Sequence, residues 1–437
     1  MHVPKTRSGL VLVLLFVACA PVLAQELQAG TAVRDITPQS PVPMWGYGDR
    51  HALLSKGVMD PLYAKALVLE AGEARIAIVT TDIGRAPTEA IMQRIRPAAL
   101  EKAGVQHVLI SGSHTHHGPV IEMIDEAGKG KGTFDAAVAY TKTYEAALID
   151  VIVEAAGNLE PARIGYGSSQ VDLNRNRQAK VEPKPRETEL TVVRVDAATG
   201  NTLATIVNFA AHPTMQPGED LRFSADYCGW MMKTVEESVA GQCMFVQGAA
   251  GDMSVQAPQE ASTPELYGKV LAAEVLKVAS GIQTTSPETP SIQFTEHTFE
   301  GKSRVDLANP MIQTLLKSAF FDEFVEAFMV ELRGETIRPV LSTALINREI
   351  YFVGVSGEFF SSHSVRLKQR IRGAQVVFQG YCNGHHLYFP TIEQAAQGGY
   401  GADATVSWVP LGMGEEMMNQ AVIDYYTMRG ELKSGMP

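Results

Sequence analysis

The sequence has little positive charge and no run of basic residues. Its 37 lysines and arginines are outnumbered by 48 aspartates and glutamates, which gives a formal net charge of −11. Proteins that bind nucleic acid need a basic surface to neutralise phosphates, so a nucleic-acid partner is not expected. An acidic surface of this kind mainly favours solubility.

Long apolar runs are missing after the first residues, so no transmembrane helix is predicted in the rest of the chain. Residues 1–24 have the pattern of an export signal: Lys5 and Arg7 precede a short apolar stretch that ends in small residues. One alternative is a lipoprotein signal with Cys19 as the lipidated residue, and another is a buried N-terminal helix. We therefore expect an exported protein, either periplasmic or secreted.

Cysteine is scarce, with four in 437 residues and no Cys-x-x-Cys pair, which excludes a cysteine-based zinc site. Three cysteines follow the predicted signal, and the odd number leaves at least one unpaired within the chain. Cys228 and Cys243 could form a disulfide in an oxidising compartment, or they could simply be small buried residues. The sequence leaves these two alternatives open.

Apolar strands alternate with segments of helical spacing along most of the chain. Residues 75–80 are a predicted strand, residues 87–103 a predicted helix, and another strand begins at His107. A single long helix is predicted for residues 310–331, and residues 284–290 are linker-like, either a domain boundary or a surface loop. The pattern predicts an α/β (mixed α+β) fold with mixed β-sheets flanked by helices. No internal repeat is recognisable in the sequence.

Polar residues repeatedly follow the predicted strands. Ligands bind outside the carboxyl ends of the strands in open α/β sheets, so clusters on parallel neighbouring strands would meet in one pocket. Five clusters have this position, at residues 111–119 (SGSHTHHGP), 211–213, 248–254, 356–359 and 381–388.

Several of these residues have the chemistry of a metal site. In an extended segment, residues two apart point the same way, so His114 and His116 can face one point. A zinc hydrolase needs about three protein ligands and an open position for water, whose pKa the metal lowers toward about 7. His114, His212 and Glu358 offer suitable donor atoms. Taken alone, His212 could instead be a core histidine, and Glu358 a carboxylate at a helix N-terminus.

Other polar residues in the clusters allow a different chemistry. Ser254 is a candidate nucleophile, although a serine in this context also caps turns. Asp35 and Asp82 are either turn residues or carboxylates that orient a ligand histidine. A metal-independent serine hydrolase built on Ser254 and a non-catalytic exported binding protein therefore stand as alternatives to a zinc enzyme.

Seven short motifs, in order, resemble those of one known family, the neutral/alkaline (non-lysosomal) ceramidases. The resemblance covers most of the chain after the signal, from about Ala29 to Gly401. The matched segments are 33–38 (VRDITP, like A-D-I-T-G-P), 45–47 (WGY, like M-G-Y), 81–84 (TDIG, like T-D-L-G), 114–119 (HTHHGP, like H-T-H-S-G-P), 251–254 (GDMS, like the start of G-D/N-x-S-P-N), 357–359 (GEF, like the end of P-G-E-F) and 382–393 (like C-N-x-Y-x-x-Y-x-T-x-x-E).

The resemblance implies a zinc-dependent amidohydrolase of an exported, membrane-associated type, which would cleave a ceramide-like N-acyl substrate to a fatty acid and a sphingoid base. It implies a substrate that is a small-molecule or lipid amide, and contact with a membrane surface. It also implies roles for particular residues: zinc ligation by His114, His212, Glu358 and Tyr388, contact with the reacting group by His116 and Arg175 (with Arg177 as the alternative arginine), and a place at the reaction centre for Ser254 as nucleophile or hydrogen-bonding group.

Three departures from the family pattern leave the substrate open between ceramide, another N-acyl amide and an ester. His117 replaces the serine of H-T-H-S, and Val255 and Gln256 replace the Pro-Asn that follows the family serine. The long C-terminal β-sandwich domain of the family is not expected here. Residues 25–437 are expected to form one catalytic domain.

Overall fold

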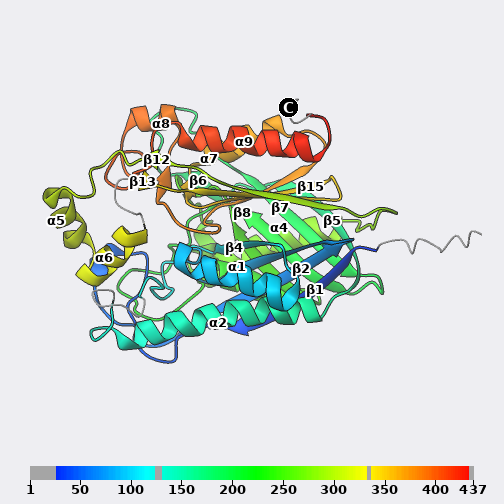
Figure 1. Ribbon diagram of the computed structural model, residues 1–437, viewed down its shortest axis with the longest axis horizontal. Helices are drawn as coiled ribbons and strands as arrows, with labels where there is room; N and C mark the ends of the chain where they lie inside the picture. Colours follow the sequence, from blue (N-terminus) through cyan, green and yellow to red (C-terminus); the bar gives the residue numbers. More distant parts are fainter. Residues whose placement is uncertain (1–25, 124–129, 332–335, 433–437) are drawn as a thin grey trace, which may run out of the picture.

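Two β-sheets packed face to face form the centre of the molecule in the computed structural model, which describes residues 26–123, 130–331 and 336–432 (Figure 1). The larger sheet has eight strands in the order β4-β3-β2-β1-β5-β7-β8-β9. The smaller sheet has four, in the order β11-β14-β15-β17. The predicted signal, residues 1–24 with Cys19, lies outside the described residues.

The sheets are built from three units with the same connectivity. In each unit, three antiparallel strands are followed by a helix, a fourth strand parallel to the third, and a second helix. The first unit is β1 (Gln28–Asp35), β2 (Tyr63–Ala71), β3 (Ala74–Thr81), α1 (Glu89–Ala103), β4 (His107–Gly112) and α2 (Asp135–Gly157). The second is β5 (Glu160–Gln170), β7 (Glu189–Ala197), β8 (Thr202–Phe209), α3 (Asp226–Ser238), β9 (Gln242–Gln247) and α4 (Pro264–Ser280). The third is β11 (Ile292–Thr298), β14 (Val340–Ile346), β15 (Ile350–Val355), α7 (Ser361–Arg370), β17 (Gln375–Gln379) and α9 (Met413–Met428).

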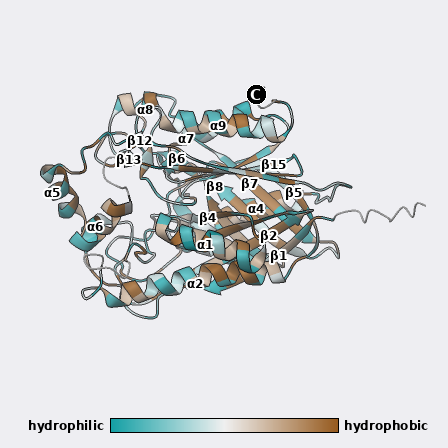
Figure 2. Cartoon of the chain, in the orientation of Figure 1, coloured by the Kyte–Doolittle hydropathy of each residue, from teal (hydrophilic) through white to brown (hydrophobic). Residues whose placement is uncertain are grey.

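The helices and sheets form four layers, because side chains on both faces of each sheet are packed against a neighbouring layer. One face of the eight-stranded sheet packs on α1 and α2 in one half and on α3 and α4 in the other. The opposite face packs on the four-stranded sheet, whose far side is covered by α7 and α9. Figure 2 shows the apolar residues concentrated on these strands. Burial on both faces explains why the strands read as nearly continuous apolar runs rather than alternating ones.

The last strands of the three units meet at their carboxyl ends. The larger sheet curls so that its edge strands β4 and β9 approach each other, and Gln247 Nε2 donates to Ser113 O at 3.2 Å. The end of β17 lies between them, because Gly380 N donates to Gln247 O and Gly112 N donates to Tyr381 O. A side chain at Gly380 would place its Cβ 2.7 Å from a backbone oxygen, so only glycine allows this approach. The five polar clusters therefore come together, although β4 and β8 are not neighbouring strands, which was the condition under which the sequence predicted this convergence.

The structure confirms the predicted mixed α/β fold, corrects one helix and decides one alternative that the sequence left open. The helix predicted for residues 310–331 is two helices, α5 (Pro310–Ala319) and α6 (Asp322–Glu331), because the backbone is extended at Phe320. Cys228 and Cys243 are free and buried, which decides against the disulfide. The threefold repeat was not visible in the sequence because only its topology recurs.

The chain segments outside the three units are short. They include two 3-10 helices at Gly48–Arg50 and Gln259–Ala261, α8 (Ile392–Gln397), and the strands β6 (Asn174–Asn176), β10 (Met253–Val255), β12 (Gly301–Lys302), β13 (Thr336–Ile337), β16 (Glu358–Phe359) and β18 (Tyr388–Phe389). Among the described residues after β18, the chain forms α8 and α9.

Candidate metal centre

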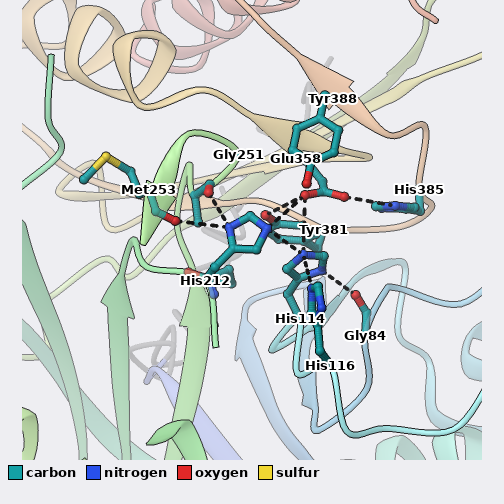
Figure 3. Close-up of polar contacts among 12 residues, drawn as sticks. Gly84, His114, His116, His212, Gly251, Met253, Glu358, Tyr381, His385 and Tyr388 are labelled. Carbon is teal, nitrogen blue, oxygen red and sulfur yellow. Dashed lines mark hydrogen bonds and ion pairs between the residues drawn. The ribbon is translucent and has the colours of Figure 1, made fainter. Parts of the chain in front are cut away.

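Loops that follow strands of all three units bring polar side chains to one point (Figure 3). His114 follows β4 of the first unit, and His212 follows β8 of the second. Glu358 follows β15 of the third unit and pairs in β16 with Tyr388 of β18. The four ligands that the resemblance implied therefore come from distant parts of the chain and lie in neighbouring loops.

Backbone carbonyls fix the orientation of two of the imidazoles. His114 Nδ1 lies 2.7 Å from Gly84 O, and His212 Nδ1 lies 2.7 Å from Ala250 O. A carbonyl oxygen can only accept, so each Nδ1 carries the proton and each Nε2 keeps its lone pair. This arrangement of a ring N–H on a carbonyl is typical of metal-binding histidines. It contradicts the view of His212 as a simple core histidine, because its Nε2 faces other polar atoms.

The free Nε2 atoms and one carboxylate oxygen have the spacing of a zinc site. His114 Nε2 and His212 Nε2 are 3.1 Å apart, and Glu358 Oε2 lies 3.4 Å from the first and 3.3 Å from the second. Zinc bonds of about 2.0–2.1 Å in a tetrahedron place neighbouring ligand atoms about 3.3 Å apart. Two lone pairs and a carboxylate this close repel one another unless a cation lies between them. The residues present therefore fit a zinc ion.

His116 belongs to the same cluster. Its Nε2 lies 3.4 Å from His114 Nε2, and the ligand atoms of His114, His116 and His212 all lie within 4.8 Å of one another. Its ring packs so closely on Gly46 that a Cβ there would lie 2.5 Å from it. His116 is thus placed either to bind the metal or to contact a group bound beside it.

Burial and mutual contacts set the charges that metal binding requires. Burial acts to raise the pKa of Glu358, but the imidazoles of His114 and His212 outweigh it and hold the pKa well below its ordinary value. Burial, followed by the charge of Arg177, lowers the pKa of His212 to about 3. The carboxylate is therefore ionised and the imidazole neutral at neutral pH, which are the forms that bind metals.

The structure brings Arg177, and not Arg175, to the metal centre. Arg177 Nη2 lies 3.0 Å from His212 Nε2 and 3.3 Å from the Tyr388 hydroxyl. Arg175 lies in the middle of β6, where its two neighbours are buried and its own side chain is exposed. Burial acts to lower the pKa of Arg177, but Tyr388 and Glu358 outweigh it and raise the pKa, so this guanidinium stays charged.

Ser254 lies beside the metal centre on a separate small sheet. It pairs with Arg175 across β10 and β6, and its backbone forms a bridge with His212. Its side chain is half-buried. The neighbouring Asp252 is fully buried and joins elements, because it accepts hydrogen bonds from Ser361 N and Asn176 Nδ2, both at 2.6 Å.

Asp35 and Asp82, which the sequence left open between turn residues and carboxylates that orient a ligand histidine, both bond to backbone. Asp35 accepts from Thr37 N at 2.8 Å, and Asp82 accepts from Tyr63 N at 2.9 Å. Asp35 is therefore a turn residue, whereas Asp82 joins the end of β3 to the start of β2. Burial raises the pKa of Asp82 to about 7.

Arg50 holds the backbone of the loop that carries His114, His116 and His117. Its guanidinium donates to His116 O at 2.5 Å and to Gly218 O at 2.7 Å, and Nη2 lies 2.6 Å from His117 Nε2. Burial followed by the charge of Arg50 lowers the pKa of His117 to about 4. His117 is fully buried in this contact, so it supports the loop and does not face the metal centre.

The metal centre lies against an apolar cavity. Much of the cavity wall is contributed by α5, α6 and the turn between them, and the rest by the loops around the cluster. The lining residues include Trp45, Tyr47, His116, Leu316, Phe320, Phe321, Phe324, Phe328, Met329, Glu358, His385, Tyr388, Tyr400 and Trp408. A cavity that combines aromatic walls with one polar cluster is the usual form of a site for an apolar small molecule.

Sequence reasoning missed three aromatic residues of this site. Tyr381 stacks on the His114 ring at 4.1 Å, His385 Nε2 lies 3.5 Å from Glu358 Oε1, and the Tyr400 ring lies 5.5 Å from that of Tyr388. Tyr381 and His385 belong to a cluster that the sequence singled out as a whole. Tyr400 lies in a glycine-rich loop, and no pattern distinguished it.

Comparisons with known proteins agree with this fold. The family model described as neutral/alkaline non-lysosomal ceramidase, N-terminal, matches residues 27–286. A neutral ceramidase of Mycobacterium tuberculosis is 26% identical over 257 residues, which are 52% of this chain and 40% of that protein. Neutral ceramidase A of Dictyostelium discoideum is 27% identical over 263 residues, which are 52% of this chain and 35% of that protein.

The third unit lies outside the matched family model but inside the structural match. The crystal structure of the neutral ceramidase from Pseudomonas aeruginosa superposes with a TM-score of 0.72 and 19% identity, covering 94% of this chain and 76% of that one. The matched segments of the two curated relatives span less than half of each relative's length. Because the family model covers more than half of the residues, the chain belongs to the neutral/alkaline non-lysosomal ceramidase family.

Proposed function

We propose that this protein is a zinc-dependent hydrolase that cleaves the amide bond of an N-acyl lipid, either ceramide or a related lipid amide. The observation that carries the proposal is the set of three donor atoms from His114, His212 and Glu358 at tetrahedral spacing beside an apolar cavity. Family membership and the names of the relatives support the ceramide-like substrate.

His114, His212 and Glu358 would hold the metal, with Tyr388 as the fourth ligand. A bound zinc ion would supply Lewis acidity and would lower the pKa of a water molecule toward about 7. The position of Tyr388 supports its assignment as the fourth ligand. It pairs with Glu358 across two short parallel strands, and its hydroxyl lies 3.3 Å from Arg177 Nη2.

Arg177 and His116 would act on the substrate. The Arg177 guanidinium is charged and half-buried beside His212, so it can donate to the oxygen on which negative charge develops during attack on an amide. Burial together with its histidine neighbours holds the pKa of His116 well below its ordinary value. A neutral imidazole there can accept a proton from the attacking water and pass it to the departing amine.

The apolar wall of α5 and α6 would bind a hydrocarbon chain of the substrate. Phe320, Phe324 and Phe328 line the cavity. Each methylene moved from water into such a site contributes about 0.8 kcal/mol. Chain length should therefore change the affinity for substrate far more than it changes the rate of the bound complex.

Metal content and rate, measured together, test the proposal. Purified protein is assayed against ceramides, N-acyl amino acids and simple esters, with and without chelator, alongside His114→Ala and Glu358→Ala. We expect stoichiometric zinc in the native protein, inhibition by chelator, and loss of both zinc and activity in the variants. A variant that keeps zinc and full activity contradicts the ligand assignment. Chelator-resistant activity that disappears in Ser254→Ala would establish the serine hydrolase instead.

We also propose export to the periplasm or the medium and contact with a membrane surface, where an N-acyl lipid resides. The export signal in residues 1–24 carries the first part of this proposal. Within the described residues no helix is both long and apolar enough to cross a membrane. Cell fractionation of the full-length protein tests the localisation, and a cytoplasmic protein that retains residues 1–24 contradicts it.

A further inference from the structure

His385 is a buried histidine in the wall of the candidate metal centre, and neither of its ring nitrogens has a hydrogen-bond partner among the described residues. Its side chain is 1% exposed. Buried polar atoms in folded proteins are nearly always hydrogen-bonded, so an imidazole without partners in a functional cavity requires an explanation. The neighbouring His386 provides a contrast, because its Nδ1 lies 3.1 Å from Ser356 O.

The contact nearest to hydrogen-bonding distance is with Glu358. His385 Nε2 lies 3.5 Å from Glu358 Oε1, and Figure 3 shows the ring pointing at this carboxylate. The other carboxylate oxygen, Oε2, is the one that lies 3.4 Å from His114 Nε2. The two oxygens of Glu358 are thus divided, with Oε2 directed at the metal position and Oε1 directed at His385.

Aromatic neighbours hold the His385 ring in this orientation. Trp45 packs its edge against the ring at 5.6 Å, and Tyr381 stacks with it at 6.2 Å and an interplanar angle of 17°. The ring cannot turn away from Glu358 without disturbing both contacts.

We propose that His385 is a positioning residue for Glu358: its Nε2–H donates to Oε1 and holds the carboxylate so that Oε2 alone faces the metal. The inference rests on the proposed zinc function. A carboxylate with one oxygen tied by a donor has a single orientation, whereas a free one can rotate or bind through both oxygens. Partners of this kind are typically worth about 10–100-fold in metal affinity.

The test measures the zinc dissociation constant of metal-free protein by competition with a chromophoric chelator. His385→Phe removes the donor and keeps the ring, and we expect it to bind zinc about 10–100-fold more weakly. His385→Gln places an amide N–H at a similar distance from Glu358, and its zinc dissociation constant should stay within a few-fold of the native value. The matched control is His107→Phe, since His107 is also a buried histidine with an unpartnered Nε2 but lies at the far end of β4.

A second measurement separates positioning from a general effect on folding. The visible spectrum of the cobalt-substituted protein reports the ligand geometry, and it should change in His385→Phe and remain native-like in His385→Gln and His107→Phe. If His385→Phe loses the native circular-dichroism spectrum, His385→Met replaces it, because methionine has similar length and no donor.

Equal zinc affinity and an unchanged cobalt spectrum in His385→Phe overturn the positioning role. If the native protein still binds zinc and cleaves an N-acyl lipid, the proposed function stands despite that result. Failure of the native protein to bind zinc stoichiometrically would overturn both proposals.

Discussion

The first and third units share one connectivity but contribute to the metal centre in different ways. In the first unit the proposed ligand His114 follows the fourth strand, and the loop after the third strand contributes the backbone oxygen of Gly84, which accepts from His114 Nδ1. In the third unit Glu358 follows the third strand and Tyr388 the fourth. The topology therefore decides where a polar side chain can reach the centre, and the local sequence decides which side chain is there.

The same comparison shows why the site could be anticipated only in part. The position of the polar clusters after strands was readable, because strand ends are marked by the change from apolar to polar residues. The arrangement of the units was not, because β4 and β8 lie in opposite halves of a curled sheet. His212 alone carries no spacing signal, so its assignment as a ligand rested on the family resemblance, and the Nδ1 contact with Ala250 O is consistent with that role.

Local backbone geometry explains the other errors. Arg175 and Arg177 could not be told apart from the sequence because the bounds of β6 were not known. Arg175 is the middle residue of this strand and points outward, whereas Arg177 follows the strand. The helical period of residues 310–331 continues across the break at Phe320, so nothing in the apolar pattern marks two helices. His385 was not distinguished because its place beside Glu358, 27 positions earlier in the chain, depends on the fold.

The largest expected effect comes from removing one ligand from each of these two units. His114→Ala and Glu358→Ala should both lose stoichiometric zinc, and activity on an N-acyl lipid should fall more than about 100-fold. Atomic absorption and initial rates on the same samples measure both quantities. If only one variant loses zinc, the two units do not contribute to one centre.

The two arginines sharpen the account of the second unit. Arg177→Ala should lower kcat by about 10²–10³, because it removes a donor beside the developing oxyanion, while zinc content stays native. Arg175→Ala is the matched control, and its exposed side chain predicts a rate close to native. Equal losses of kcat in the two variants would show that Arg177 is not the arginine that acts on the substrate.

Buried histidines predict an acid limit to the stability of the metal-free protein. Burial lowers the pKa of His107 and of His117 to about 4, from an ordinary value of 6.5. Between these values the two histidines bind more protons in the unfolded chain than in the folded one, so their contribution to stability falls as the pH drops from about 6.5 toward 4. Asp82, whose pKa burial raises to about 7, acts in the opposite sense, so the histidine contribution is measured as a difference between variants. Over this range the Tm of chelator-treated native protein should fall relative to that of His107→Phe, and a constant difference between the two contradicts the argument.

The smallest effect concerns the segment that only the third unit carries, α5 and α6. Phe324→Ala enlarges the cavity and should raise KM for long-chain substrates several-fold, with little change for a two-carbon acyl group. Met311→Ala on α5 is the control, because Met311 is 79% exposed and does not line the cavity. An equal change for short and long chains would indicate that the phenylalanine does not contact the hydrocarbon.

If side chains from three units hold one zinc ion, zinc X-ray absorption on the purified protein will identify its ligands. We predict one zinc per chain with two imidazoles and oxygen ligands at about 2.0–2.1 Å, and no sulfur shell near about 2.3 Å. Sulfur ligation, or a stoichiometric zinc with fewer than two imidazoles, would contradict the account.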